Sequence, residues 1–276
     1  MEISHRFKIP EENEKAAAFW AENMQARVFV SSQGLELPYR LYIPPEPKPG
    51  MPFQLHLHGG GLRGNDNLLQ LQGDHRQTQM LTSYQKKEAF FFAIPQCPMG
   101  FMWSPGTKYN ELWKSYLHYT PEESTVVRAL YELTLALTEE FGLDERQRYV
   151  SGCSMGGSGA YDLLVRYPGL FKGAVIGCAN ADASITARLK DNPIYLMHGS
   201  EDQAIYVENA RLMARYLREA GAPDFEYVEF PGRGHNFMEP DCADDDLEAA
   251  MDWIRGKIKA KLSSDGKSAT EQAPRC

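Results

Sequence analysis

One stretch near the middle of the chain, residues 149–157, constrains the fold more than any other. It begins with aromatic and β-branched residues that suit a buried strand, passes through Gly-x-Ser-x-Gly, and continues to Tyr167 as a helix. A serine at the apex of so sharp a turn needs small residues two positions away on either side, and Gly152 and Gly156 stand there. The pattern therefore predicts a strand, a strained turn that exposes the Ser154 hydroxyl, and a helix whose N-terminus favours negative charge.

A second interpretation of this stretch is open at this point. Gly-x-Ser-x-Gly is short and occurs by chance, and Ser154 also suits the N-cap of a helix after a glycine-rich turn. The choice between a reactive hydroxyl and a capping hydroxyl depends on whether the rest of the chain supplies partners for a nucleophile.

Strand-like and helix-like segments alternate along most of the chain. Besides the strand that opens residues 149–157, the predicted strands are 26–31, 37–43, 53–57, 90–94, 173–178, 193–198 and 225–230, and the predicted helices are 10–24, 120–141, 157–167, 205–220 and 245–261. Thr120 is the predicted N-cap of its helix, and Gly142 is the predicted end. The alternation predicts an α/β fold with a mostly parallel sheet of about eight strands, helices on both faces, and Ser154 after the fifth strand.

The length of 276 residues fits a single large α/β domain. We expect residues 1–25 to form an N-terminal helical extension, residues 26–262 to form the α/β catalytic domain, and residues 263–276 to be a disordered polar tail. No run approaches the roughly 18 to 20 apolar residues of a membrane span, and residues 1–10 lack the apolar core of a signal peptide. These features predict a cytoplasmic protein.

Composition narrows the class of partner. A formal net charge of -8 argues against nucleic acid and against an anionic membrane surface. The five cysteines are scattered and have neither zinc-ligand nor redox spacing, so we expect reduced thiols. No His-Glu-x-x-His is present. We expect no metal and no cofactor, a small-molecule substrate as the partner, and leave homo-oligomerisation open.

A serine hydroxyl needs a base, and the base needs an acid that orients it. Asp202 lies four residues past the predicted strand 193–198, and His235 lies on the loop after 225–230. Taken alone, Asp202 suits a turn or N-cap, and His235 suits an exposed loop. Functional groups gather at the carboxyl ends of parallel strands, and the order serine, aspartate, histidine is that of a serine hydrolase on this architecture. The coincidence favours a catalytic set of Ser154, Asp202 and His235.

A loop rich in glycine follows the early strand 53–57. It reads His58-Gly59-Gly60-Gly61, the type of loop whose backbone N–H groups bind the negatively charged oxygen of a tetrahedral intermediate. We expect the donors to be Gly60 or Gly61, together with Met155 after the serine. A phosphate-binding loop is the alternative, but no Gly-Lys-Ser/Thr follows, which excludes a P-loop.

Four pieces of the sequence together carry a resemblance to a known family. They are His58-Gly59-Gly60-Gly61 with 63–67, Pro95-Gln96-Cys97-Pro98 with Trp103, residues 152–157, and Gly234-His235-Asn236. Over about residues 26–261 the chain resembles the α/β-hydrolase superfamily, and within it the esterases labelled "predicted peptidases", which are related to feruloyl and acetyl-xylan esterases.

The resemblance implies a nucleophile at Ser154, a base at His235, an acid at Asp202 and an acyl-enzyme intermediate. It also implies that Trp103, in the aromatic segment 101–119, forms a wall of the substrate pocket, whereas the alternative is that these aromatic residues pack as the core of a surface loop. Members of the group more often carry another small residue where Gly60 stands, and the helix before the sheet has no clear counterpart among them.

Three functions follow as hypotheses. The first is a carboxylesterase acting on small acetyl, aryl or hydroxycinnamoyl esters. The second is a serine peptidase acting on short peptides, and comparison of ester with amide substrates separates these two. The third is a binding protein that keeps the fold without the chemistry, which failure of a fluorophosphonate to label Ser154 would favour.

Overall fold

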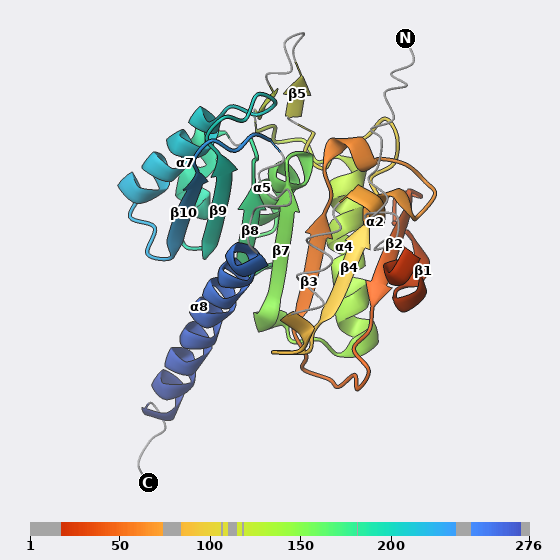
Figure 1. Ribbon diagram of the computed structural model, residues 1–276. Coiled ribbons are helices and arrows are strands. Elements are labelled where there is room, and N and C mark those ends of the chain that lie inside the picture. The colour runs from red at the N-terminus through yellow and green to blue at the C-terminus, as the bar shows by residue number, and fades with distance from the viewer. Residues whose placement is uncertain are drawn as a thin grey trace.

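The computed structural model describes residues 18–73, 84–105, 107–109, 115–117, 119–180, 182–235 and 244–271 (Figure 1). Its strands are β1 (Gln25–Val30), β2 (Glu36–Tyr42), β3 (Phe53–Leu57), β4 (Phe91–Pro95), β5 (Thr107–Tyr109), β6 (Ser115–Leu117), β7 (Arg148–Cys153), β8 (Gly173–Gly177), β9 (Ile194–Gly199) and β10 (Phe225–Phe230). Its helices are α2 (Leu69–Gly73), α4 (Thr125–Phe141), α5 (Met155–Arg166), α6 (Thr186–Leu189), α7 (Val207–Glu219) and α8 (Asp244–Glu271), with short 3₁₀ turns η1 (Gly60–Leu62), η2 (Glu145–Gln147) and η3 (Ala183–Ile185).

Eight strands form the main sheet, in the order β1-β2-β4-β3-β7-β8-β9-β10. β2 runs antiparallel to both of its neighbours, and the other pairs are parallel. The predicted mostly parallel sheet is therefore confirmed, and the serine turn follows β7, the fifth strand of this sheet along the chain. β5 and β6 form a separate antiparallel pair outside it.

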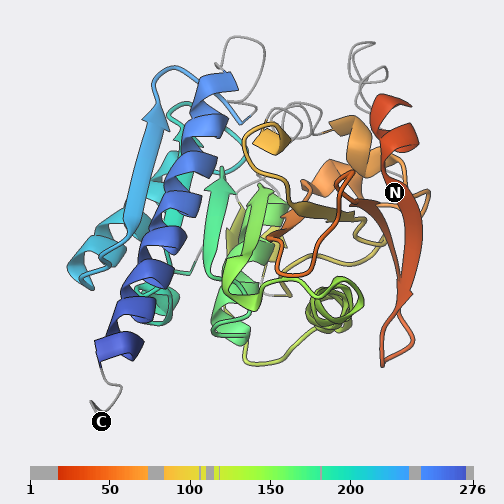
Figure 2. The same cartoon turned by 90° about the horizontal axis from the view of Figure 1, so that it is seen from below.

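Two apolar cores lie on the two faces of the main sheet. One core contains side chains of α4, α5 and α7, and the other contains side chains of α8 together with Trp20 and Met24. Figure 2 shows α4 and α8 with the sheet between them. The strands β3, β4 and β8 are buried along their whole length, as strands covered on both faces must be.

The described N-terminal residues agree with the predicted helix, whereas the C-terminal end differs from the sequence-based expectation. Residues 18–23 are helical, within the predicted helix 10–24, and the preceding residues lie outside the described part. At the other end, α8 continues through Glu271, although a disordered tail was expected from residue 263. The hydroxyls of Ser263 and Ser264 donate to carbonyls of the preceding turn, so these polar residues continue the helix instead of ending it.

The start of α4 is also later than predicted. Ser124, and not Thr120, is the N-cap, and its hydroxyl accepts a hydrogen bond from the N–H of Val127 at 3.3 Å. The carbonyl of Thr120 accepts a hydrogen bond from Arg166, which keeps this residue in the connecting segment. Gly142 ends the helix as predicted, with a left-handed backbone at φ 61°.

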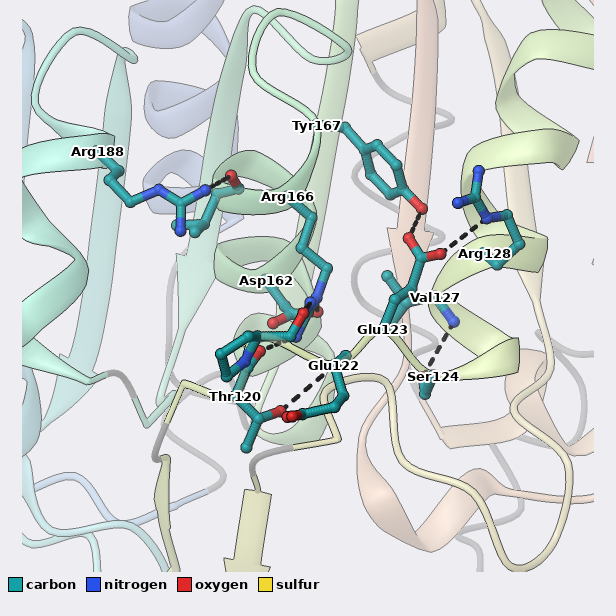
Figure 3. A network of polar contacts seen from close by, with 12 residues as sticks. Thr120, Glu122, Glu123, Ser124, Val127, Arg128, Asp162, Arg166, Tyr167 and Arg188 are labelled. Carbon is teal, nitrogen blue, oxygen red and sulfur yellow. Dashed lines mark hydrogen bonds and ion pairs between the residues drawn. The ribbon is translucent and has the colours of Figure 1, made fainter.

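A buried ion pair fixes this connecting segment to α5 (Figure 3). Arg166 Nε lies 2.7 Å from an oxygen of Asp162, and the two side chains are 5% and 1% exposed. The same guanidinium donates to the carbonyls of Thr120 and Pro121 at 2.6 and 3.0 Å, and it stacks over the ring of Tyr119. The helix that follows the serine turn is therefore tied at its far end to the chain leading into α4.

The helices of the described residues differ from a membrane span in length or in hydropathy. None of them is both long enough and apolar enough to cross a bilayer.

Candidate active site

Ser154 lies between β7 and α5 in a backbone conformation that residues other than glycine rarely adopt. Its φ is 56° and its ψ is -122°, and its N–H donates to the carbonyl of Gly177 at 2.9 Å. The flanking glycines are required by space. A Cβ atom on Gly156 would lie 1.8 Å from the carbonyl oxygen of Leu57, and one on Gly152 would lie 2.5 Å from the Gly156 carbonyl carbon. The Gly-x-Ser-x-Gly pattern is therefore the sequence of a strained, closely packed turn.

The fold brings the three residues predicted for catalysis together. His235 Nε2 lies 3.0 Å from Ser154 Oγ, and His235 Nδ1 lies 2.8 Å from an Asp202 oxygen. Asp202 is buried, whereas the side chain of His235 is 29% exposed. The three residues come from the loops after β7, β9 and β10, so the carboxyl ends of three strands meet here.

Asp202 combines the two roles that the sequence left as alternatives. Its Oδ1 accepts hydrogen bonds from the N–H groups of Ala204 and Ile205, each at 2.8 Å, which is the use of an aspartate in a turn. Its Oδ2 faces His235. One carboxylate oxygen therefore fixes the loop, and the other is left for the imidazole.

A second histidine, His198, also bonds Asp202 and was not expected from the sequence to take part in the site. Its Nε2 lies 3.1 Å from Asp202 Oδ2 and 2.8 Å from the carbonyl of Ile205, and its side chain is fully buried. Because a carbonyl only accepts, Nε2 carries the proton. Burial opposes the charge of Asp202, but the hydrogen bonds from His198 and His235 hold the pKa of that carboxyl well below its usual range. Asp202 is therefore ionised at neutral pH.

The glycine loop after β3 passes beside the serine. A Cβ atom on Gly59 would lie 3.9 Å from the Cβ of Ser154. The ring of His58 accepts the N–H of Cys97 at its Nε2, so its Nδ1 carries the proton and donates to the carbonyl of Gly59 at 2.7 Å. The N–H of Gly60 belongs to the same peptide unit and points the opposite way, because the two groups of a planar trans peptide are opposed.

Three N–H groups were expected to bind an oxyanion, those of Gly60, Gly61 and Met155. None of them makes a hydrogen bond to another of the described residues. Met155 is the first residue of α5, where an N–H has no partner within the helix. All three therefore keep their hydrogen-bonding capacity for a bound group.

The side chain of Gln96 supports the glycine loop from a distant part of the sequence. It is fully buried, accepts the N–H of Asn67 at 2.7 Å, and donates to Asp66 Oδ1 at 2.9 Å and to the carbonyl of Leu62 at 3.3 Å. These contacts join two of the sequence pieces that carried the family resemblance. The loop is thus held in place by side chains, which suits a preorganised binding site.

The prediction for Trp103 is wrong. The side chain is fully buried, so it does not form a wall that a substrate can reach. Its Nε1 donates to the carbonyl of His58 at 3.0 Å, and its Cβ packs so closely on α5 that a Cβ on Gly159 would lie 2.5 Å away. Trp103 is a structural support between the glycine loop and the helix after Ser154, and no pattern in the sequence shows that its side chain is buried.

Parts of the sequence are similar to known proteins. A family model described as "Prolyl oligopeptidase family" matches residues 179–261, a segment that contains Asp202 and His235. An uncharacterized secreted protein of Arthroderma benhamiae is 44% identical over 43 residues, which are 16% of this chain and 4% of that protein.

Solved structures match over most of the chain. A thermostable esterase has a TM-score of 0.68 and 29% identity, over 89% of this chain and 64% of its own. A ferulic acid esterase has a TM-score of 0.61 and 14% identity, over 84% of this chain and 97% of its own. Dipeptidyl peptidase 4 of Porphyromonas gingivalis has a TM-score of 0.58 and 14% identity, over 87% of this chain and 35% of its own. These proteins share the fold of this chain, which spans less than two thirds of the length of the first and the third.

Proposed function

We propose that this chain, which has the α/β-hydrolase fold, is a serine hydrolase that cleaves carboxylic esters with small acyl or aryl groups through an acyl-enzyme. The observation that carries the proposal is the hydrogen-bonded series from Ser154 through His235 to Asp202, with distances of 3.0 and 2.8 Å. Nucleophile, base and orienting acid within hydrogen-bond reach are the geometric signature of this chemistry.

The first half of the cycle uses the tautomer that Asp202 imposes. The ionised carboxylate holds the proton on His235 Nδ1, which leaves the Nε2 lone pair to accept the proton of the Ser154 hydroxyl as its oxygen attacks the ester carbonyl. The carbonyl oxygen becomes an oxyanion, and the N–H groups of Gly60 or Gly61 and of Met155 are placed to stabilise it.

The second half returns the enzyme to its starting state. His235 gives the proton on Nε2 to the leaving alcohol, and the C–O bond breaks to leave an acyl group on Ser154. A water molecule then loses a proton to the same Nε2 and attacks the acyl carbon. Collapse of the second tetrahedral intermediate releases the carboxylic acid, and the proton returns to the serine oxygen.

Two comparisons support an ester as the substrate. The thermostable esterase is similar at 29% identity over 89% of this chain, and the ferulic acid esterase shares the fold over 97% of its own length. On this basis we propose acetyl and hydroxycinnamoyl esters as the substrate class. The partly exposed side chain of His235 leaves room for an alcohol to depart, since a leaving group must reach its Nε2.

A serine peptidase that acts on short peptides is the second candidate. The match of residues 179–261 to the prolyl oligopeptidase family and the fold shared with dipeptidyl peptidase 4 favour it. A third candidate, a binding protein without chemistry, has no comparison in its favour.

Paired substrates separate these candidates. Purified protein is given nitrophenyl acetate and a feruloyl ester, and in parallel the matching nitroanilide and feruloyl amide. Hydrolysis of the esters far above that of the amides supports the esterase, and the reverse supports the peptidase. Ser154→Ala should lower kcat by about a million-fold. The control Ser158→Ala should stay active, because the Ser158 hydroxyl lies one helical turn away and donates to the main-chain carbonyls of Ser154 and Asn180. If a fluorophosphonate labels neither the wild type nor Ser158→Ala, the binding-protein candidate replaces both the esterase and the peptidase.

A further inference from the structure

Cys178 lies directly behind the proposed catalytic residues, although the proposed mechanism does not use it. It follows β8 with a left-handed backbone at φ 37°, and its N–H donates to the carbonyl of Met197 at 2.8 Å. Its side chain is buried. One donor atom from each of Cys178, Asp202 and His235 lies within 4.8 Å of the other two. A sulfur, an oxygen and a nitrogen from three different loops therefore converge on one point.

We propose that Cys178, Asp202 and His235 form a site for Zn²⁺, and that the metal inhibits the enzyme by binding there. Zn²⁺ takes thiolate, imidazole and carboxylate ligands, and it is commonly held by three protein side chains with a water molecule in the fourth position. A donor set that contains a thiolate selects zinc over Mg²⁺ and Ca²⁺, which prefer oxygen ligands.

The donor atoms need a small rearrangement to hold the ion. Metal–ligand distances of about 2.0–2.3 Å in a tetrahedral site place neighbouring donor atoms roughly 3.3–3.7 Å apart. The longest separation within the set is at most 4.8 Å, so the most distant donors must close by up to about 1.1–1.5 Å. His235 Nδ1 and Asp202 Oδ2 lie 2.8 Å apart, so this pair opens by about 0.5–0.9 Å where both atoms bind the ion. The side chain of His235 is 29% exposed, so this ligand is able to move and the ion is able to enter from its side.

The charges of the three ligands balance the ion. Asp202 is ionised, and Cys178 contributes a second negative charge when zinc displaces its thiol proton into solvent. Two negative ligands and one neutral imidazole around Zn²⁺ give a net charge of zero, which a buried position tolerates. Without metal, a hydrogen bond with Cys153 and burial raise the pKa of the Cys178 thiol, so it stays protonated and neutral beside Asp202.

Zinc at this site removes the base whichever nitrogen it takes. Bound to Nε2, the ion occupies the lone pair that receives the serine proton. Bound to Nδ1, it uses the lone pair of that nitrogen and leaves the proton on Nε2, which then faces Ser154 without a lone pair. In both cases Ser154 loses its proton acceptor, so metal binding and catalysis exclude one another.

The test uses the full chain freed of metal and measures hydrolysis of nitrophenyl acetate against free Zn²⁺ set by a metal buffer. We expect inhibition that EDTA reverses and that equal concentrations of Mg²⁺ or Ca²⁺ do not produce. Cys178→Ala should keep its basal activity and raise the inhibition constant for zinc at least about tenfold, since loss of a ligand costs no less than loss of a residue supporting one. Cys178→Ser provides the same comparison with a smaller change in volume. Cys97→Ala is the matched control, because this buried thiol lies in the other core cluster and its variant should be inhibited as the wild type is.

Two results would overturn the proposal. One is equal inhibition of Cys178→Ala and the wild type, and the other is full activity of the wild type in excess zinc. Cd²⁺ provides a readout that does not need catalysis, since a cadmium–thiolate bond adds an ultraviolet charge-transfer band, which should appear in wild type and Cys97→Ala and be weaker in Cys178→Ala. If the ester assay shows no activity but this difference appears, the metal site stands and the proposed function fails.

Discussion

Replacement of Arg166 by methionine tests the buried ion pair at the far end of α5. The change leaves Asp162 without its charged partner at a position where the carboxylate is 1% exposed. Breaking such a pair costs about 3–5 kcal/mol, because a buried charge is left uncompensated. Protonation of Asp162 limits this penalty. Keeping a carboxyl of ordinary pKa protonated costs about 4 kcal/mol at pH 7 and about 1.5 kcal/mol at pH 5.

The structure sets the size and the direction of the effect. Burial already raises the pKa of Asp162 even though Arg166 opposes the shift, so the variant raises this pKa further. When a carboxyl has a higher pKa in the folded state than in the unfolded state, the folded protein loses stability as the pH rises above the unfolded-state pKa. The two lost hydrogen bonds to Thr120 and Pro121 add about 1 kcal/mol each at either pH. We expect Arg166→Met to lower the free energy of unfolding by roughly 5–6 kcal/mol at pH 7 and by about 1.5–2.5 kcal/mol less at pH 5.

Urea unfolding followed by circular dichroism at the two pH values measures both quantities against the wild type. The double variant Asp162→Asn, Arg166→Met carries neither charge of this pair. It should therefore lose the pH dependence of the destabilisation and regain the stability that Arg166→Met loses through the unpaired carboxylate. Arg146→Met is the matched control, because Arg146 pairs with Asp144 while its side chain is 70% exposed. This variant should change the free energy of unfolding very little. A loss for Arg166→Met that is equal at pH 5 and pH 7 would refute the reasoning.

Three further predictions concern the site and its support. Asp202→Asn should lower kcat about 10⁴-fold; because the pKa of Asp202 is lowered in the folded state, the wild type should lose stability relative to this variant as pH falls below about 4, seen in urea unfolding from pH 5 to pH 3. Gly156→Ala should abolish folding, since its Cβ would lie 1.8 Å from a main-chain oxygen of β3. Gly256→Ala, at an open position of α8, should instead raise the free energy of unfolding by about 0.5–1 kcal/mol in the same urea assay. Trp103→Phe should cost about 1 kcal/mol through the lost hydrogen bond to His58 and leave KM for small esters unchanged, and a large rise in KM would restore a substrate-binding role.

The parts of the fold that the sequence predicted are those with a local cause. The strands β3 and β10 begin and end where predicted because short apolar or alternating runs are bounded by proline, glycine or turn residues. The convergence of Ser154, Asp202 and His235 could be predicted because each follows a strand, and parallel strands end at a common edge. Gly142 ended α4 as expected because left-handed backbone strongly favours glycine.

The parts that failed depend on contacts between distant residues. Thr120 looks like an N-cap, but Arg166 binds its carbonyl from another helix. Trp103 has the same sequence neighbourhood whether it faces a substrate or the core, and only the packing against Gly159 decides. His198 and Cys178 have no spacing that connects them to Asp202, because β8, β9 and the loops after them meet only in the folded sheet.

The carboxylate of Asp202 couples the shape of one loop to the reactivity of a distant imidazole. One of its oxygens closes the turn that leads into α7 and the other orients His235, so neither task can change without the other. A glutamate, with one more methylene, would have to choose between them. In the proposed mechanism, a fluctuation that opens this turn therefore also withdraws the negative charge from the imidazole, and Ser154 is not activated until the turn closes again.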